Sequence, residues 1–368
     1  MATLDITILG LSITSSWGNG HATTYRGLVR SLAARGHRVT FLERDVPWYA
    51  DNRDLANPPG CQTELYDSLD ELRGRFSTTI READVVVVGS YVPDGIAVGK
   101  WVQESAENLT AFYDIDTPIT LARLAEDDCE YLSPDLVSQY DLYLSFSGGK
   151  SLQRLEREFH SPLARPLYCS VDPEHYYPLE TEQRYDLGYL GTYSTDRQPP
   201  LEKLLIEPAS QYPQGRFVVA GPQYPDTIRW PPNVERIDHL PPAEHCRFYN
   251  SQRFTLNVTR AEMIRAGHSP SVRLFEAAAC GTPIISDWWA GLDELFEPDR
   301  EILIGKSSAE VLRLLQRIDA TEAAAIGHAA RERVLADHTA DRRAEQFEQF
   351  VEEANQKRSQ SRVPKRIS

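Results

Sequence analysis

Residues 267–296 read GHSPSVRLFEAAACGTPIISDWWAGLDELF, and this stretch predicts a helix followed by a short strand. Ser269 before Pro270 is a good pair for the N-cap and first position of a helix, and residues 272–279 continue with helix-forming types. The run at 283–286 is one of a series of short apolar runs separated by helical patterns. That alternation predicts a parallel sheet covered by helices.

The same alternation runs along the whole chain. Expected strands lie at 6–11, 39–43, 83–88, 110–114 and 142–146 in the first half, and at 186–190, 216–220, 254–258 and 283–286 in the second. The continuous valines at 85–88 fit a strand that is buried on both faces. The clearest helical pattern is 24–35, with Gly36 as its stop. We therefore expect an α/β protein with two Rossmann-like parallel-sheet domains facing a central cleft.

The length of 368 residues fits two domains. The alternation lapses in the polar, proline-containing stretch 170–184, which is the expected join. We place an N-terminal domain at 1–178 and a C-terminal domain at 185–338. A last helix follows at 339–356, and 357–368 is a basic tail that we expect to be disordered.

The formal charge of −15 argues against a protein whose main partner is nucleic acid, because such a protein needs a surface that neutralises phosphates. An anionic ligand would instead need a local basic site. The five cysteines show no C-x-x-C spacing, which indicates free thiols in a reducing compartment. Asp5 interrupts any leader-like start, and no run of about 18 apolar residues exists. We expect a cytoplasmic protein without a transmembrane segment.

The expected helix at 272–279 has the features of an anion site. A helix N-terminus offers N–H groups and the positive end of the helix dipole. His268, Ser269, Ser271 and Arg273 add donors at that end, and an arginine can grip a phosphate through two N–H groups. A diphosphate is the natural ligand. Glu276, further along the helix, could accept hydrogen bonds from the hydroxyls of a ribose.

This segment resembles the donor-binding motif of GT-B nucleotide-sugar glycosyltransferases. Its amino-acid sequence is most similar to that of the group-1-type transferases that include the CgeB-like spore-maturation proteins. The family pattern is matched at His268, Glu276, Gly281 and Pro283. The resemblance implies that His268 lies near the diphosphate or sugar and that Glu276 binds the ribose. Retaining members usually carry Glu at the His268 position, whereas the His form resembles inverting plant-type enzymes, so the stereochemistry stays open.

The resemblance covers most of the chain. Residues 168–178 are similar to the stretch that joins the two domains, and 186–197 to the first strand and loop of the donor domain. It implies that Arg197 meets the diphosphate, that the final helix crosses back onto the first domain, and that Trp288 and Trp289 shape the sugar pocket. The expected donor-binding residues are Gly20, Thr192, Arg197, His268, Ser269, Ser271, Arg273, Glu276, Asp287, Gly291 and Asp293.

The first half contributes a loop that begins at Ser12, after the expected strand at 6–11, and leads into the helix at 24–35. Gly18 and Gly20 would let backbone approach a ligand, but the loop lacks the G-x-G-x-x-G fingerprint, so a dinucleotide cofactor has little support. His21 matches the plant-type transferases, in which the loop histidine deprotonates the acceptor hydroxyl. A solvent-facing residue at a helix N-terminus is an equal alternative for His21.

Asp114 and Asp116 follow the expected strand at 110–114, where ligand groups collect in α/β folds. Their D-x-D spacing also matches the metal site of the unrelated GT-A transferases. We prefer a role in orienting His21 or contacting the acceptor, because the two-sheet plan favours GT-B, which normally needs no metal.

The sequence thus predicts a metal-independent, hexosyltransferase-like glycosyltransferase without a cofactor, using a UDP-type sugar donor. Its acceptor is a small-molecule, glycan or protein hydroxyl. Two alternatives stay open: a nucleotide-sugar epimerase of the same fold, using Asp287 and Asp293, and a non-catalytic protein that binds a sugar nucleotide or glycan.

Overall fold

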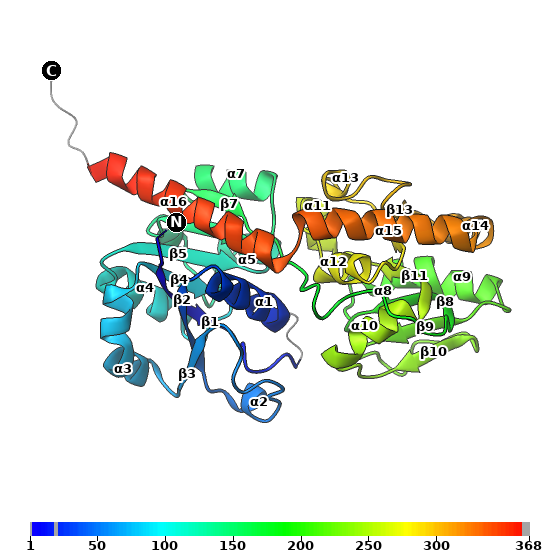
Figure 1. Cartoon of the computed structure of the whole chain (residues 1–368), viewed down its shortest axis with the longest axis horizontal. Helices are drawn as coiled ribbons and strands as arrows, with labels where there is room; N and C mark the ends of the chain where they lie inside the picture. Colours follow the sequence, from blue (N-terminus) through cyan, green and yellow to red (C-terminus); the bar gives the residue numbers. More distant parts are fainter. Residues whose placement is uncertain (1, 18–20, 363–368) are drawn as a thin grey trace, which may run out of the picture. The chain divides into compact units, whose positions relative to one another are not determined.

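The structure is a computed structural model that describes residues 2–17 and 21–362. The chain forms two compact units, each described by itself below. The first combines Met1–Cys169 with Ala340–Ser368, and the second is Ser170–Thr339. In each unit a parallel sheet is flanked by helices (Figure 1).

The first unit is built on a seven-stranded parallel sheet of order β3-β2-β1-β4-β5-β6-β7. Its strands are β1 (Asp5–Gly10), β2 (Arg38–Arg44), β3 (Gln62–Tyr66), β4 (Val85–Gly89), β5 (Leu109–Asp114), β6 (Leu142–Ser145) and β7 (Ala164–Pro166). Its helices are α1 (His21–Ala34), α2 (Pro47–Ala50), α3 (Leu69–Glu82), α4 (Gly95–Ser105), α5 (Thr117–Ala125), α6 (Pro134–Val137), α7 (Lys150–Arg157) and α16 (Ala340–Arg362). The strand order reverses between β1 and β4, which is where such sheets bind ligands.

The second unit is built on a six-stranded parallel sheet of order β10-β9-β8-β11-β12-β13. Its strands are β8 (Tyr185–Leu190), β9 (Phe217–Ala220), β10 (Val234–Ile237), β11 (Gln252–Asn257), β12 (Ile284–Ser286) and β13 (Leu303–Ile304). Its helical segments are α8 (Gln198–Leu201), η1 (Glu202–Ile206), α9 (Glu207–Gln211), α10 (Pro242–Asn250), α11 (Ala261–Ala266), α12 (Val272–Ala279), α13 (Leu292–Leu295), α14 (Ser308–Arg317) and α15 (Ala320–Asp337). Here the strand order reverses between β8 and β11.

These two sheets confirm the expected fold class. All nine expected strands are present, and the valines of β4 are buried as their continuous run predicted. The structure adds β3, β7, β10 and β13. All four strands lie at sheet edges, and β13 is only two residues long. Short edge strands are half exposed, so they carry little apolar signal.

The division between the units falls after Cys169, earlier than the expected boundary at 178. Residues 170–184 pack within the second unit instead of forming a free join. Val171 forms a backbone bridge to Thr339, and the Leu179 N–H donates to Asn250 Oδ1 at 2.8 Å.

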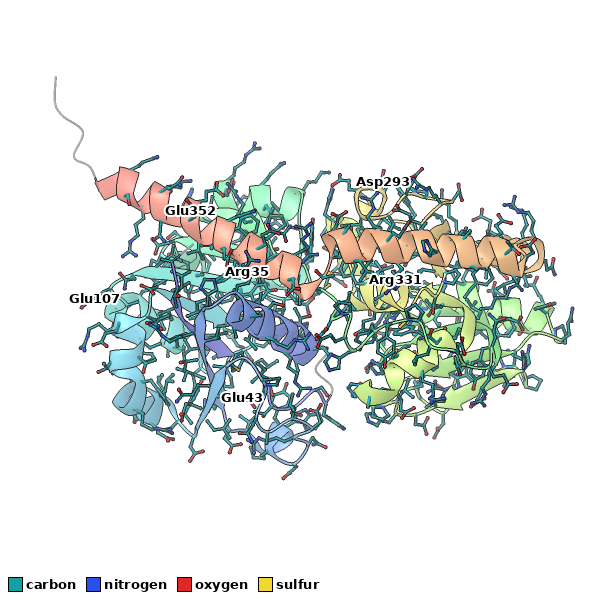
Figure 2. The ribbon with its side chains drawn as sticks, viewed as in Figure 1. Arg35, Glu43, Glu107, Asp293, Arg331 and Glu352 are labelled. Carbon is teal, nitrogen blue, oxygen red and sulfur yellow. The ribbon has the colours of Figure 1, made fainter. Side chains whose placement is uncertain are left out.

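The last helix, α16, belongs to the first unit and lies along α1 (Figure 1). Phe347, Val351 and Ala354 of this helix are buried. Arg35, labelled in Figure 2, donates two hydrogen bonds to Glu348 of α16, at 2.8 and 2.7 Å. His37 Nε2 lies 2.8 Å from the same carboxylate. Apolar packing and a shared carboxylate therefore hold α16 in place.

The expected disorder of 357–368 is wrong for the part that the structure describes, because α16 continues to Arg362. Arg358 donates to the Glu107 carbonyl at 3.0 Å and lies 3.7 Å from the Asp141 carboxylate. Lys357 donates to the Pro162 carbonyl. Residues 363–368 lie outside the described residues. Within the described ranges, no helix has the length and apolar character needed to cross a membrane.

Candidate functional site

In the second unit, side chains converge where β8 and β11 end and α12 begins. Asn257, the last residue of β11, accepts hydrogen bonds at its Oδ1 from Ser271 Oγ at 2.8 Å and from Arg273 Nη1 at 3.0 Å. Arg273 Nε donates to the carbonyl of Leu190, the last residue of β8. The guanidinium lies over the ring of Tyr189, 4.8 Å from its centroid. Arg273 therefore joins the carboxyl ends of two neighbouring strands.

The charge of Arg273 is buried beside neutral partners. Arg273 is only 8% exposed. Within the described residues, the guanidinium donates hydrogen bonds to a backbone carbonyl and to an amide oxygen. A buried cation whose hydrogen bonds go to neutral acceptors attracts an anion, because little solvent screens it. The charge of Arg273 also acts on the nearby Asp287 carboxylate. Arg273 thus has the environment of a diphosphate-binding residue.

The loop after β8 lies against this arginine. A Cβ built on Gly191 would come within 2.8 Å of Arg273 Nη2, and one on Gly221 within 2.1 Å of the Gly191 carbonyl. At Gly221 the obstacle is backbone and φ is +140°, so only glycine fits there, whereas at Gly191 the nearest atoms are the ends of the Tyr189 and Arg273 side chains. The Tyr189 hydroxyl beside Gly191 is buried without a hydrogen-bond partner in the described part of the chain. A buried hydroxyl without a partner beside a buried cation fits an anionic ligand, because such a ligand would accept hydrogen bonds from both.

The expected N-cap at Ser269 is wrong. The helix α12 begins at Val272, with Ser271 at the N-cap position and no side-chain cap. Ser269 Oγ instead donates to the Gly267 carbonyl at 3.0 Å, and Ser271 Oγ is turned to Asn257. Serine hydroxyls often bond locally in this way in place of capping. The Ser271 side chain therefore makes no capping hydrogen bond to the first turn of α12.

His268 is held in a fixed orientation next to this helix. Its φ is +48°, its N–H donates to the Ala290 carbonyl at 2.7 Å, and Nε2 lies 3.0 Å from Glu294 Oε1. Gly291 lies under the imidazole: an added Cβ would come within 2.4 Å of the ring. Gly291, expected to bind the donor, thus packs against His268. Asp293, expected to bind the donor, is exposed on α13 (Figure 2).

Glu276 is buried on α12, and one carboxylate oxygen accepts a hydrogen bond from the Tyr249 hydroxyl at 3.0 Å. Burial, and then the Glu276 carboxylate, raise the pKa of both Tyr249 and Tyr176 well above the usual tyrosine value. Neighbouring Cys246 and Cys280 are free thiols with their sulfur atoms 3.9 Å apart. The carboxylate therefore has a fixed orientation set by a tyrosine of α10.

Three other expected donor-site residues make local contacts. Arg197 folds back on its own loop, donating to Ser194 Oγ and to the Thr192 carbonyl, both at 2.9 Å. Asp287 accepts hydrogen bonds from the Thr259 N–H at 2.8 Å and hydroxyl at 2.7 Å. Burial raises the Asp287 pKa, although the bonds from Thr259 and the charge of Arg273 act the other way. Asp287 therefore orders the loop after β11.

In the first unit, Asp114 and Asp116 have different environments. Asp114 is fully buried and accepts hydrogen bonds from the Tyr143 hydroxyl at 2.7 Å, Thr120 Oγ1 at 2.8 Å and the Asp116 N–H at 3.1 Å. Burial raises its pKa to about 6, against these bonds. Asp116 is half-buried and accepts a bond from the Tyr91 hydroxyl at 2.9 Å. Among the described residues, no group of three His, Cys, Asp or Glu side chains could hold a metal ion.

His21 is the first residue of α1, and its ring centroid lies 6.0 Å from that of Phe146. Burial lowers the pKa of His21 to about 4, so its imidazole is neutral near pH 7. A neutral imidazole can accept a proton from an alcohol. The neighbouring Gly20, expected to contact the donor, lies outside the described residues.

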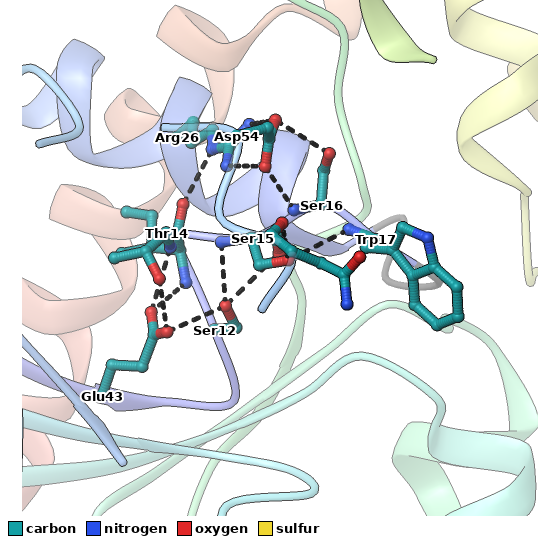
Figure 3. Close-up of polar contacts among 10 residues, drawn as sticks. Ser12, Thr14, Ser15, Ser16, Trp17, Arg26, Glu43 and Asp54 are labelled. Atoms are coloured by element: carbon teal, nitrogen blue, oxygen red, sulfur yellow. Dashed lines mark hydrogen bonds and ion pairs between the residues drawn. The ribbon is translucent and has the colours of Figure 1, made fainter. Parts of the chain in front are cut away.

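The loop after β1 depends on Glu43, which the sequence did not identify as a site residue. This fully buried carboxylate, in β2, accepts hydrogen bonds from the backbone N–H groups of Ile13 and Thr14 at 2.6 and 3.0 Å (Figure 3). Hydroxyls of Ser12 and Thr14 donate to it at 3.0 and 2.6 Å. The only feature of the sequence that could have identified Glu43 was its position as an acidic residue at the end of the apolar run 39–43.

Residues 197–349 match the family model described as glycosyl transferase-like. Nearly the whole chain also resembles several solved structures. HepE of Anabaena, solved with UDP and glucose, shares 13% identity over 95% of this chain and 100% of its own, with a TM-score of 0.72. Sucrose-phosphate synthase of Thermosynechococcus elongatus shares 16% over 96% of this chain and 99% of its own, with a TM-score of 0.69.

An α-glucosyltransferase solved with UDP-glucose and DNA containing an abasic site shares 15% identity over 95% of this chain and 100% of its own, with a TM-score of 0.67. None of the curated protein sequences matches this chain. The two parallel sheets and these likenesses define the GT-B fold, and most of the stretch that matches the glycosyl transferase-like model lies in the second unit.

Proposed function

We propose that this protein is a glycosyltransferase that moves a sugar from a nucleoside diphosphate sugar to a hydroxyl group of an acceptor. The observation that carries the proposal is the buried guanidinium of Arg273, whose hydrogen bonds go to neutral acceptors and which lies at the start of α12, where no side chain makes a capping hydrogen bond. The glycosyl transferase-like match over this region and neighbours solved with UDP or UDP-glucose support a UDP-type donor.

The donor diphosphate would bind at Arg273 and the first turn of α12. When the bond between the sugar C1 and the phosphate oxygen breaks, its electron pair stays on the diphosphate. Arg273, Ser271 and His268 would stabilise that developing charge, since donors fixed in advance are most effective where charge appears. The fixed carboxylate of Glu276 would accept hydrogen bonds from the ribose hydroxyls.

The acceptor hydroxyl would lose its proton to the neutral imidazole of His21 if the reaction inverts the anomeric configuration. Asp116 is the better candidate for orienting that histidine, because three donors already bind the Asp114 carboxylate. A retaining reaction would need no protein base at this position. Transfer requires the acceptor on the first unit and the donor on the second to meet during the catalytic cycle.

The proposed acceptor is a small molecule, glycan or protein, since the acidic chain disfavours nucleic acid. The α-glucosyltransferase neighbour was solved with DNA, but that acceptor belongs to that protein. Five free thiols fit a cytoplasmic location. The amino-acid sequence of the α12 motif supports the CgeB-like subtype. Catalysis without a metal is part of the proposal, and added EDTA should leave the rate unchanged.

A thermal-shift screen of nucleoside diphosphates and their sugars tests the donor site, because a ligand that binds the folded state raises the melting temperature. We expect UDP and a UDP-sugar to give the largest shifts. Incubation of that donor with and without acceptor then separates the alternatives. Isomerised donor without acceptor would indicate an epimerase. Binding without turnover under any acceptor would indicate a non-catalytic sugar-nucleotide or glycan-binding protein.

A further inference from the structure

Two indole rings of the first unit lie together on its surface. Trp48 is 56% exposed and Trp17 is 37% exposed, so two large apolar side chains are accessible to solvent. Their ring centroids are 4.4 Å apart with an angle of 77° between the planes, an edge-to-face pair. Paired aromatic rings left in water mark an interaction surface, since their burial against a ligand would be favourable.

A continuous set of hydrogen bonds fixes the backbone that carries the two rings. The backbone N–H of Trp17 donates to Ser15 Oγ at 3.3 Å, and that hydroxyl donates to the Asn52 carbonyl at 2.7 Å. Asn52 Nδ2 in turn donates to the Trp48 carbonyl at 2.9 Å. Figure 3 shows this segment continuing from the Glu43 cluster, with the Trp17 ring pointing away from Glu43.

A second contact fixes the same segment from the side of α1. Asp54 accepts bonds from the Ser16 N–H and hydroxyl at 2.7 and 2.9 Å, and it forms an ion pair with Arg26 at 2.8 Å (Figure 3). These bonds lower the pKa of Asp54 to about 2 although burial opposes them. Because the backbone under both rings is already ordered, a ligand that stacks on them loses little free energy in ordering the protein.

The groups around the rings indicate the ligand class. The segment that follows Trp48 reads YADNRD, with an exposed carboxylate at Asp51 and the Asn52 amide. Carboxylate and amide oxygens accept hydrogen bonds from hydroxyl groups, while the apolar C–H face of a sugar ring can cover an indole. The Asp51 carboxylate, in a chain of charge −15, disfavours phosphates and acidic sugars.

We propose that Trp17 and Trp48 form an acceptor platform that binds a neutral, hydroxyl-rich saccharide by stacking. This inference rests on the proposed function and names the acceptor class for it. Trp17 precedes His21 by four positions in the sequence, so the platform and the candidate base lie on the same stretch of chain.

Saturation-transfer NMR on the full chain tests the platform. The probes are four neutral disaccharides (cellobiose, maltose, lactose and chitobiose), with glucuronic acid, 4-nitrophenol and an eight-nucleotide thymidine strand as other classes. We expect binding of at least one neutral disaccharide. Its affinity should fall about tenfold or more in Trp48→Ala and Trp17→Ala and less in Trp48→Phe, which keeps an aromatic face. Tyr177→Ala, which removes an exposed aromatic of the second unit, is the matched control and should change nothing.

Three results would overturn the platform: no transfer to any of the four disaccharides, binding that the tryptophan substitutions leave unchanged, or tighter tryptophan-dependent binding of 4-nitrophenol or the oligonucleotide. Thermal melting of each variant checks folding, and Trp48→Phe keeps the test valid if an alanine variant unfolds. UDP affinity distinguishes failure of the platform from failure of the proposed glycosyltransferase function. Loss of the platform alone leaves UDP binding intact, whereas failure of the proposed function removes UDP binding from the wild-type protein.

Discussion

The imidazole of His268 rests on the Cα of Gly291, so closely that a Cβ at residue 291 would lie 2.4 Å from ring atom Cδ2. Gly291 also has a φ of +94°, a conformation that favours glycine. The glycine therefore sets the position of the histidine, which Glu294 fixes from its other side.

Substitution Gly291→Ala should displace His268 and weaken UDP binding. The matched control is Gly36→Ala, because Gly36 has the same φ of +94° but no atom within 4 Å of an added Cβ. Both variants should lose about 1–2 kcal/mol of unfolding free energy from backbone strain. Calorimetric titration should show a loss of UDP affinity in Gly291→Ala alone. Equal UDP affinity in the two variants would show that His268 does not contact the donor.

Substitution Arg273→Lys should weaken UDP binding by about tenfold or more, because lysine cannot keep both bonds at the strand ends and also grip a phosphate. Arg253→Lys is the control. Arg253 likewise stacks on an aromatic ring, that of Phe254, and donates to two backbone carbonyls of the same unit. Chemical denaturation measures the stability of both variants and calorimetry their UDP affinity. A similar UDP affinity in the two variants would refute the diphosphate role of Arg273.

The pH dependence of stability should carry a component from Glu348. Hydrogen bonds from Arg35, and then from His37, lower the Glu348 pKa to about 2. A carboxylate whose pKa is lowered on folding stabilises the folded state above its unfolded pKa of about 4.3, and this stabilisation is lost as the pH falls towards 2. In urea titrations the stability difference between wild type and Glu348→Gln should therefore shrink from pH 5 to pH 2.5.

Glu345→Gln is the control for that measurement, since Glu345 lies on the same helix but pairs with Arg342 on the surface. Its stability difference from wild type should stay small at every pH. A pH-independent difference for Glu348→Gln would mean that the carboxylate charge contributes nothing to the docking of α16.

Catalysis by His21 predicts an acid limb near pH 4 in the pH profile of kcat/KM, because burial lowers the histidine pKa to that value. His21→Ala should reduce kcat by about a hundredfold or more while UDP affinity stays the same. His328→Ala, a histidine exposed on α15, is the control. A midpoint near pH 6 that Asp114→Asn removes would assign the titration to Asp114, and unchanged kcat in His21→Ala would exclude the base role.

The sequence predicted the fold class and nine strands because buried parallel strands leave continuous apolar runs, as in Val85 to Val88. It missed β10, where only Val234 is buried, since a half-exposed edge strand has no such run. It also misjudged 357–362. A basic, polar composition indicated disorder, but the contacts that order Arg358 come from Glu107 and Asp141, far away in the sequence.

The candidate site shows the same limit. Motif spacing identified His268 and Glu276, and the expected helix start identified Arg273; all three have defined contacts in the second unit. It could not show that Gly291 packs under His268, that Ser271 replaces Ser269 at the N-cap, or that Glu43 orders the loop after β1. These are relations between side chains that the fold brings together, and no local pattern encodes them.

The central claim is that α12 binds the ribose and diphosphate of a nucleotide, and calorimetric titration of Glu276→Gln with UDP and with inorganic pyrophosphate tests it most directly. Glutamine keeps an acceptor for Tyr249 but loses the charge that strengthens bonds from ribose hydroxyls. The account predicts that UDP affinity falls about tenfold while pyrophosphate affinity is unchanged. Equal UDP affinity in wild type and variant, or no UDP binding to either, would contradict it.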